Sequence, residues 1–213
     1  MDVIARAFQL MQDRQDFFLE LLGEHLRISF TAICIAMVLG LIIGILVSEF
    51  SFISKPTIAV VNLLYTIPSI SLLGFLIPFS GIGDTTAIIA LTIYALLPMV
   101  RNTYTGMTTV SPQLLDAATA MGSTRIQVLL RIRLPLALPV IVAGIRSMTV
   151  MTIALSGISS FIGAGGLGVA VYRGITTNNK AMTLAGSLLI ALLAVVADFF
   201  IGMVERAVKK HRS

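Results

Sequence analysis

The sequence predicts an all-α integral membrane protein with five transmembrane helices, an N-terminal surface helix and short helices in one cytoplasmic loop. Of its 213 residues, 57% are hydrophobic and only 12% are charged, whereas a soluble domain carries about 25% charged residues. The mean hydropathy is +0.98. Apolar stretches long enough to cross a bilayer recur along the chain, so we expect the bilayer to be its solvent.

Residues 1–27 differ from the rest because they are amphipathic. Apolar side chains fall near helical spacing among five acidic residues and three arginines. This pattern predicts a helix that lies along the membrane surface, with a frayed terminal segment as the alternative. Acidic residues in this number are atypical of a cleaved signal peptide.

The membrane domain is expected over residues 28–205, followed by a basic tail at 206–213. Its five spans are predicted at residues 28–47, 57–79, 85–100, 136–158 and 181–204. Pro68 and Pro98 are expected to kink the second and third spans. Arg146 and Asp198 are the charged residues inside these spans.

Positive charges indicate the orientation of the chain. Four basic residues lie in the tail, and four arginines lie in the loop of residues 101–135, so both segments are predicted to be cytoplasmic. Five spans place the two termini on opposite sides, and the N-terminus is therefore expected outside. This topology accounts for the net charge of +5, and no nucleic-acid partner is expected.

The loop of residues 101–135 is long enough to have structure of its own. Apolar residues at helical spacing cover residues 113–130. Ser111 and Pro112 are typical of a helix start, whereas Gly122 and Ser123 interrupt the run. We therefore expect two short helices joined by a glycine turn.

An Asp-Ala-Ala triplet in this loop is followed at fixed spacings by a glycine and an Ile-x-Leu-Pro group. The residues are Asp116, Ala117, Ala118, Gly122, Ile132, Leu134 and Pro135. Every spacing resembles the EAA loop of ABC importer permeases, with aspartate in place of glutamate as the one departure. The resemblance implies the fold of type I ABC importer permeases, and coupling helices that dock into a groove of an ATPase subunit.

Six further stretches resemble the osmoprotectant, or quaternary-amine, branch of these permeases. They are residues 66–69, 74–78, 81–83, 94–98, 101–106 and 161–168. The resemblance implies import of glycine betaine, carnitine or choline by alternating access across the bacterial plasma membrane. It also implies three partners: a second permease, identical or a sister chain; a cytoplasmic ATPase dimer that holds ATP and magnesium; and an extracellular substrate-binding protein.

Other functions stay open at this point. A permease for another small solute, such as methionine, shares the five-span plan. An ion-coupled secondary transporter calls for more intramembrane carboxylates than Asp198, and a membrane enzyme calls for clustered catalytic or metal-binding side chains. The sequence contains no P-loop pattern, so we expect ATP hydrolysis in a partner chain and neither a bound cofactor nor an enzymatic activity in this one.

Polar residues inside the spans are candidates for function. Arg146 and Asp198 both fall in the inner half of the membrane, so we predict that they pair; alternatively, Asp198 neutralises the basic tail. Asn62 and Tyr65 share a helix face, and together with Pro68 they are candidates for the translocation path. An interhelical hydrogen bond is the alternative role for that face.

Four glycines cluster before the last span, at Gly163, Gly165, Gly166 and Gly168. Their spacing fits the G-x-G-x-x-G pattern of dinucleotide sites, but a membrane helix precedes them where that site needs a strand. We therefore reject the nucleotide site. The segment is predicted to make a tight turn or re-entrant backbone at the outer mouth, where it faces the binding protein.

Overall fold

The computed structural model describes residues 3–210, and all regular secondary structure among them is helical. In chain order the elements are α1 (Val3–Asp13), α2 (Gln15–Glu49), α3 (Ser51–Thr66), α4 (Ser69–Ser80), α5 (Asp84–Thr108), α6 (Pro112–Ala120), α7 (Arg125–Val128), the π turn η1 (Leu129–Arg133), α8 (Leu134–Ser156), the 3-10 turn η2 (Gly157–Ile162), α9 (Gly168–Thr176) and α10 (Lys180–Lys210).

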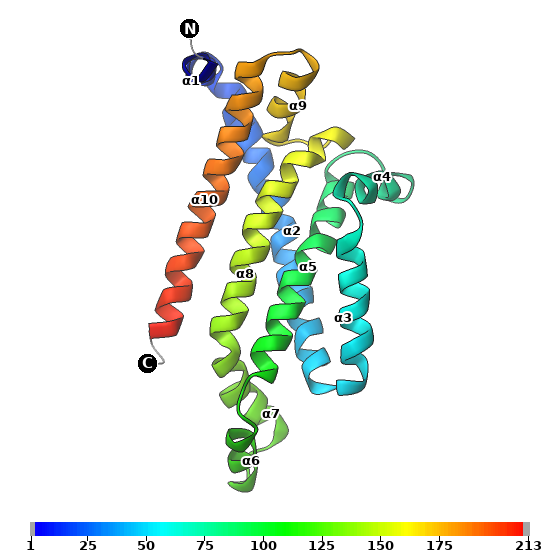
Figure 1. Ribbon diagram of the computed structural model, residues 1–213, viewed down its shortest axis with the longest axis vertical. Helices are drawn as coiled ribbons and strands as arrows, with labels where there is room; N and C mark the ends of the chain where they lie inside the picture. The colour runs from blue at the N-terminus through cyan, green and yellow to red at the C-terminus, as the bar shows by residue number, and fades with distance from the viewer. Residues whose placement is uncertain (1–2, 211–213) are drawn as a thin grey trace.

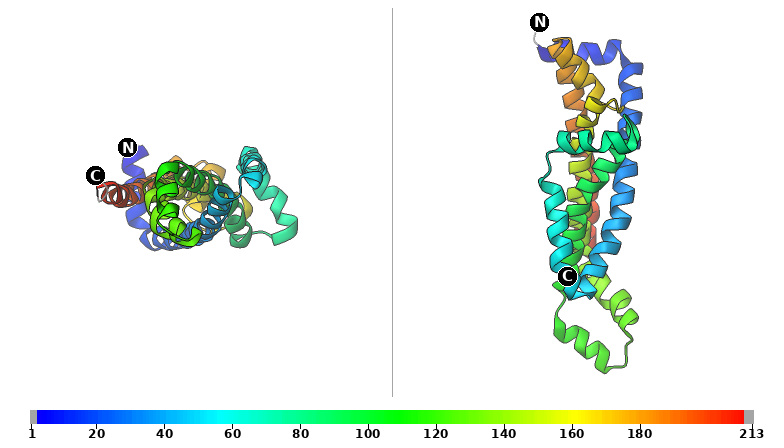
Figure 2. Two further views of the ribbon diagram at one scale, coloured as in Figure 1. Left: turned by 90° about the horizontal axis from the view of Figure 1, so that it is seen from below. Right: turned by 90° about the vertical axis from the view of Figure 1, so that its right-hand side faces the viewer.

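Long helices that run side by side form the body of the molecule (Figure 1). α5 packs against both α2 and α8, and α10 packs against α8. The end where α1, α4 and α9 gather is called the outer end here. The inner end carries α6, α7 and the last turns of α10 (Figures 1 and 2). Within residues 3–210, four helices are long and apolar enough to span a membrane, or five spans result if α3 and α4 count as one bent span. The predicted all-α membrane fold is thus confirmed.

The second span differs from its prediction. We expected one kinked helix over residues 57–79, but the helix breaks at Ile67 and Pro68, and α3 and α4 meet at 99°. Proline supplies no N–H and holds the residue before it in an extended conformation, which accounts for the break. The Tyr94 hydroxyl donates a hydrogen bond to the freed Ile67 carbonyl. α4 therefore lies across the outer end, whereas Pro98 does not interrupt α5 (Figure 1).

The predicted segment boundaries also need correction. Residues 1–27 are not one helix, because α1 ends at Asp13 and residues 15–27 are the first part of α2. At 1.5 Å per residue α2 is about 50 Å long, longer than the hydrocarbon core of about 30 Å, so its polar first turns extend beyond it. Residues 206–210 of the predicted tail continue α10. Residues 1–2 and 211–213 lie outside the described residues.

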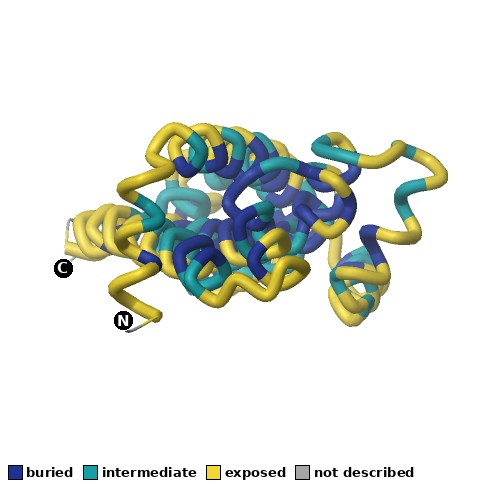
Figure 3. Tube along the Cα trace, turned by 90° about the horizontal axis from the view of Figure 1, so that it is seen from above, coloured by how far each residue is buried: buried dark blue, intermediate teal, exposed yellow. Residues whose placement is uncertain are grey.

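Buried residues gather in the middle of the bundle, whereas α10 is exposed along much of its length (Figure 3). The exposed faces of α2 and α10 carry large apolar side chains, among them Phe30, Leu39, Leu192, Val195 and Phe199. Such faces are suited to lipid or to a second membrane chain. They contrast with the face of α8 described below, which exposes polar groups.

Candidate functional site

Two short helices at the inner end, α6 and α7, form what we call the inner hairpin, residues 112–128. α6 starts at the position that the sequence predicts. Pro112 occupies the first turn of α6 after Ser111, although the Ser111 hydroxyl bonds to a side chain and caps no backbone group. α7 begins with a capping box in which Thr124 Oγ1 accepts from Gln127 N (3.3 Å) and Gln127 Oε1 accepts from Thr124 N (2.9 Å). The predicted pair of helices is present.

Gly122 makes the turn between the two helices. α6 ends in a Schellman motif, in which Ser123 N–H donates to Ala118 O (3.1 Å) and Gly122 N–H donates to Thr119 O (2.9 Å). Gly122 has a φ of +86°, and residues with a β-carbon adopt that region only with strain. The glycine of the EAA pattern is therefore the residue that lets the hairpin close.

The surface of the inner hairpin that points away from the bundle is exposed and partly apolar. Asp116 and Ala117 are exposed on α6, and Leu114, Met121 and Ile126 are 53%, 86% and 68% exposed. The hairpin extends beyond the bundle (Figure 1). Exposing apolar side chains to water there does not stabilise the chain on its own. A surface of this kind is typical of a protein-docking site.

The rest of the predicted motif joins the hairpin to the membrane bundle. Leu134 is the first residue of α8, and Pro135 follows in its first turn. Directly before them η1 widens into a π turn, where Leu134 N–H reaches back to Leu129 O. Ile132 and Leu134 are half-buried, and Leu134 packs on the core formed by α2, α5 and α8. The hairpin thus continues into α8 without a flexible linker.

Two open cavities meet on one face of α8. The first, of about 530 Å³, lies between α8 and α10, and the second, of about 610 Å³, lies between α3, α5 and α8. Ser147 and Met151 line both. The two cavities, together called the hollow here, share this part of their walls and expose hydroxyl, amide and charged groups along the membrane body.

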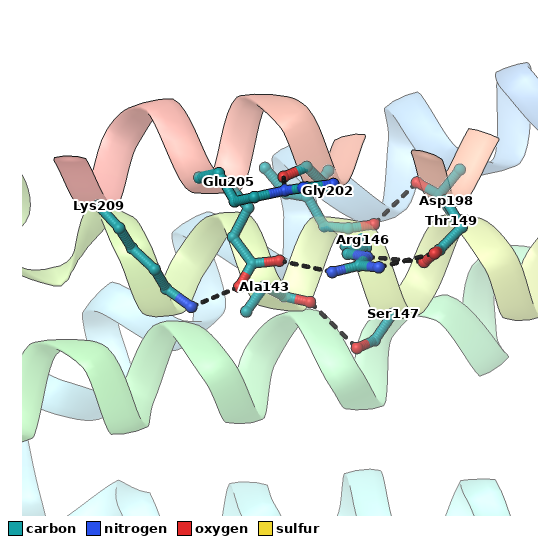
Figure 4. Close-up of polar contacts among 10 residues, drawn as sticks. Ala143, Arg146, Ser147, Thr149, Asp198, Gly202, Glu205 and Lys209 are labelled. Carbon is teal, nitrogen blue, oxygen red and sulfur yellow. Dashed lines mark hydrogen bonds and ion pairs between the residues drawn. The ribbon is translucent and has the colours of Figure 1, made fainter. Parts of the chain in front are cut away.

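The cavity between α8 and α10 holds an ion-pair network (Figure 4). Arg146 donates to Asp198 through Nε to Oδ1 (2.6 Å) and through Nη2 to Oδ2 (2.7 Å), a two-bond geometry that fixes both groups. Arg146 Nη1 also donates to Glu205 Oε2 (3.0 Å), and Lys209 Nζ donates to Glu205 Oε1 (2.6 Å). The structure brings Arg146 and Asp198 together, and Glu205 joins them. Asp198 therefore pairs with Arg146 and does not neutralise the basic tail.

The three path candidates on the second span are separated by the structure. Tyr65 lines the cavity between α3, α5 and α8, and its hydroxyl lies 3.5 Å from Met151 Sδ. Its ring meets that of Tyr94 edge-on, with centroids 6.0 Å apart. Asn62 and Pro68 are exposed but are not among the lining residues, and Pro68 belongs to the break before α4.

The glycine segment lies at the outer end and is held by carboxylates from two other helices. Gly166 N–H donates to Glu24 Oε2 (2.9 Å), and Gly165 N–H donates to Asp84 Oδ1 (3.1 Å). Gly163 is the C-terminal cap of η2, and Gly168 begins α9. Gly166 has a φ of +97°, and a β-carbon there would lie 3.1 Å from the Cα of His25. The segment is therefore a turn that is held in place by hydrogen bonds to two other helices.

Comparison with known proteins identifies the family. Residues 36–210 match the family described as binding-protein-dependent transport system inner membrane component. The chain belongs to this family of permeases. The choline transport system permease protein OpuBD of Bacillus subtilis (strain 168) is 39% identical over 217 residues, covering 100% of this chain and 96% of the relative.

A second relative and a solved structure agree with this assignment. The glycine betaine/carnitine/choline transport system permease protein OpuCD of Bacillus subtilis (strain 168) is 38% identical over 208 residues, 97% of this permease and 91% of the relative. A structure described as inward facing conformations of the MetNI methionine ABC transporter superposes with a TM-score of 0.84 at 26% identity, covering 91% of this permease and 97% of that chain.

Membership of the family decides between the classes of function left open by the sequence. The permease is a multi-pass inner-membrane transport subunit and not an enzyme. Because transport in this family depends on binding proteins, the ion-coupled secondary transporter is excluded as a class of function. Among residues 3–210 no group of three or more His, Cys, Asp or Glu side chains is placed to hold a metal ion.

Sequence reasoning missed the residue that fastens the inner hairpin to the permease body. Arg133, at the end of η1, pairs with Glu49 of α2, and its Nε donates to Met107 O of α5 (2.8 Å). Its side chain is only 15% exposed. The sequence showed Arg133 as one of several basic loop residues, and its partners are distant in the chain, so nothing local could reveal this role.

His25 was also missed, although its position before a long apolar run was a signal. Its side chain is fully buried between α2 and α8. Nε2 lies 3.1 Å from Ile153 O and 2.8 Å from Ser156 Oγ. A buried imidazole is stable when such partners exist, and the contact ties α2 to the outer half of α8.

Proposed function

We propose that this permease forms half of the membrane path of an ATP-driven importer for quaternary-amine osmoprotectants such as glycine betaine, carnitine and choline. The observation that carries the proposal is the similarity, over nearly the full length of both chains, to two permeases named for these solutes. The hollow on α8 supports it, because polar groups along a membrane helix need water or protein beside them and not lipid.

The inner hairpin is the proposed docking site for a cytoplasmic ATPase dimer that holds ATP and magnesium. Exposed apolar residues on the hairpin supply the contact surface, and Asp116 adds a charge at its edge. The Schellman turn, η1 and Arg133 make the hairpin continuous with α8 and fasten it to α2 and α5. Movement of the ATPase subunits can therefore turn the bundle as a rigid body and switch the side that is open.

A second permease is the proposed partner of the hollow face. One chain leaves the hollow open along α8, and a two-fold or pseudo-two-fold axis would enclose it between two such faces. The partner is a second copy of this chain or a sister permease. Alternating access then opens the enclosed path to one side at a time.

The outer end is the proposed contact for the extracellular substrate-binding protein, on which the family depends. α4, α9 and the fastened glycine segment present a firm surface there (Figure 1). This assignment sets the N-terminus outside and the C-terminus in the cytoplasm. Its support is that the basic end of α10 and the inner hairpin share one end of the molecule, as the positive-inside rule requires.

Solute uptake tests the proposal. The permease, its ATPase and its binding protein are expressed together in a bacterium that lacks other quaternary-amine uptake, and labelled glycine betaine, carnitine and choline are supplied. We expect uptake of at least one of them, lost when the ATPase subunit is inactivated. Uptake of none of these solutes by a complex that assembles would refute the assignment.

Methionine is the second candidate solute. The similarity to the methionine transporter structure supports it, at 26% identity against 38% for the permease named for glycine betaine, carnitine and choline. The same cells are therefore given labelled methionine in parallel. Methionine uptake without quaternary-amine uptake is the result that would replace the first proposal by the second.

A further inference from the structure

The cavity between α3, α5 and α8 combines an aromatic ring, an amide and an arginine in one hollow of about 610 Å³. Tyr65 contributes the ring from α3, and Arg101 and Asn102 come from α5. Ser147 and Met151 of α8 complete the wall and connect it with the ion-paired cavity beside α10. A volume of this size holds a small organic solute.

Arg101 has no charged partner, unlike three other arginines of the bundle. Arg27, Arg133 and Arg146 each pair with a carboxylate, whereas Arg101 makes no hydrogen bond or ion pair with another side chain among residues 3–210. Residues 101–108, which the sequence placed in the cytoplasmic loop, continue α5 to Thr108. Arg101 therefore lies within α5, about 25 Å along the helix from Asp84 and toward the inner end. An unpaired guanidinium at such a place attracts an anionic group.

The neighbouring cavity does not compete for that anionic group. The guanidinium of Arg146 is held by the carboxylates of Asp198 and Glu205, and Lys209 is bonded to Glu205 as well. Each cation of this network is already matched. Of the cationic side chains that line the two cavities, Arg101 is therefore the one available to a carboxylate.

The aromatic side of the cavity suits a quaternary ammonium. Tyr65 is 44% exposed, and its ring is fixed by the edge-on contact with Tyr94 and by the bond to Met151. A quaternary ammonium is attracted to the face of such a ring, and the polarisable thioether of Met151 adds to the contact. Asn102 is fixed too, because its Nδ2 donates to Pro98 O (2.7 Å) and keeps a second N–H free.

We propose that Tyr65, Arg101 and Asn102 form a transient site for zwitterionic quaternary amines within the permease. The ring of Tyr65 takes the ammonium group, and Arg101 with the free N–H of Asn102 takes the carboxylate. The inference rests on the proposed function and names the solute class of the path. It gives the permease a selectivity of its own, separate from that of the binding protein.

Two solutes distinguish this site from a path without selectivity. Glycine betaine carries both an ammonium and a carboxylate, whereas choline carries the ammonium and a hydroxyl. Both meet Tyr65 alike, but only glycine betaine gains from the charge of Arg101. Loss of that charge therefore acts on one solute and spares the other.

The test is uptake by cells that express the complete importer and lack other quaternary-amine uptake. Initial rates are measured with saturating labelled glycine betaine and, separately, choline. We expect Arg101→Gln to lower glycine betaine uptake about tenfold and to leave choline uptake within about twofold of wild type. Tyr65→Leu lowers both rates about two- to fivefold, and Tyr65→Phe lowers neither. Lys55→Gln, which removes an exposed positive charge near the start of α3, is the matched control.

The possible outcomes distinguish a failure of the proposed site from a failure of the proposed function. Equal loss of both solutes in Arg101→Gln, or unchanged glycine betaine uptake, overturns the site. If that variant is absent from the membrane, Arg101→Lys decides, because its single point charge predicts a smaller but still selective loss. A wild type that carries choline and no carboxylate-bearing amine overturns the site alone. A wild type that carries neither solute overturns the proposed function and the site with it.

Discussion

Replacing Gly122 by alanine tests whether the conformation of the inner hairpin couples the permease to its ATPase. A β-carbon at this position meets no atom within 4 Å, so the substitution causes no clash. Its whole effect comes from the φ of +86°, which costs a residue with a side chain about 1–2 kcal/mol. The hairpin of the variant will relax to a turn that no longer presents α6 and α7 together.

The expected loss follows from that free energy. If only the strained turn can dock, binding of the ATPase subunit to Gly122→Ala weakens about 5- to 30-fold. Gly122→Asn should lose less, because asparagine enters the left-handed region more readily. The assay is the dissociation constant between purified permease complex and ATPase subunit, together with ATP-dependent uptake.

A matched control separates this effect from loss of a glycine as such. Gly23 lies in α2, and a β-carbon there also meets nothing within 4 Å, but its φ is outside the left-handed region. Gly23→Ala should bind the ATPase as wild type does. Wild-type binding by Gly122→Ala, or equal losses in its alanine and asparagine variants, would refute the argument.

Four further substitutions, in three experiments, probe the bundle to which the hairpin is attached. Arg133→Gln and Glu49→Gln, measured singly and together, should show a coupling energy of about 1 kcal/mol in detergent unfolding. Strictly additive effects of the two substitutions would count against a stabilising Arg133–Glu49 ion pair. Asp198→Asn should lower the melting temperature and increase spin-label mobility on α10, because one oxygen that accepts from Arg146 is replaced by a donor; an unchanged spectrum contradicts this. Gly166→Ala should lower uptake with solute delivered by the binding protein while ATPase binding stays intact, and loss of both together is the opposing result.

The sequence could predict features that depend on spacing along one helix or loop. The EAA spacing placed the hairpin and its glycine turn, because helix starts and a left-handed C-terminal residue have local signatures. The positions of Arg146 and Asp198 along two helices that run side by side placed them at one depth, and the structure shows them bonded. These features need only the helix rise and the order of the spans.

Features set by packing between distant segments were out of reach. Pro68 predicted a kink, but the angle of 99° between α3 and α4 depends on how α4 packs against α5. The partners of Arg133 are a carboxylate in α2 and a carbonyl in α5, which no loop pattern indicates. Asn62 and Tyr65 share a helix face, yet only Tyr65 lines the cavity. Which turn of α3 borders the cavity depends on how α3 packs against α5.

Crosslinking from the tip of the inner hairpin during uptake tests the central claim most directly. A cysteine replaces Met121, which is 86% exposed on the hairpin, or Phe79, which is 76% exposed at the outer end, and Cys34→Ser removes the native thiol. During ATP-dependent uptake of glycine betaine, position 121 should crosslink to the ATPase subunit and position 79 should not. No crosslink from position 121 in complexes that actively take up the solute, or an ATPase crosslink from position 79, would contradict the account.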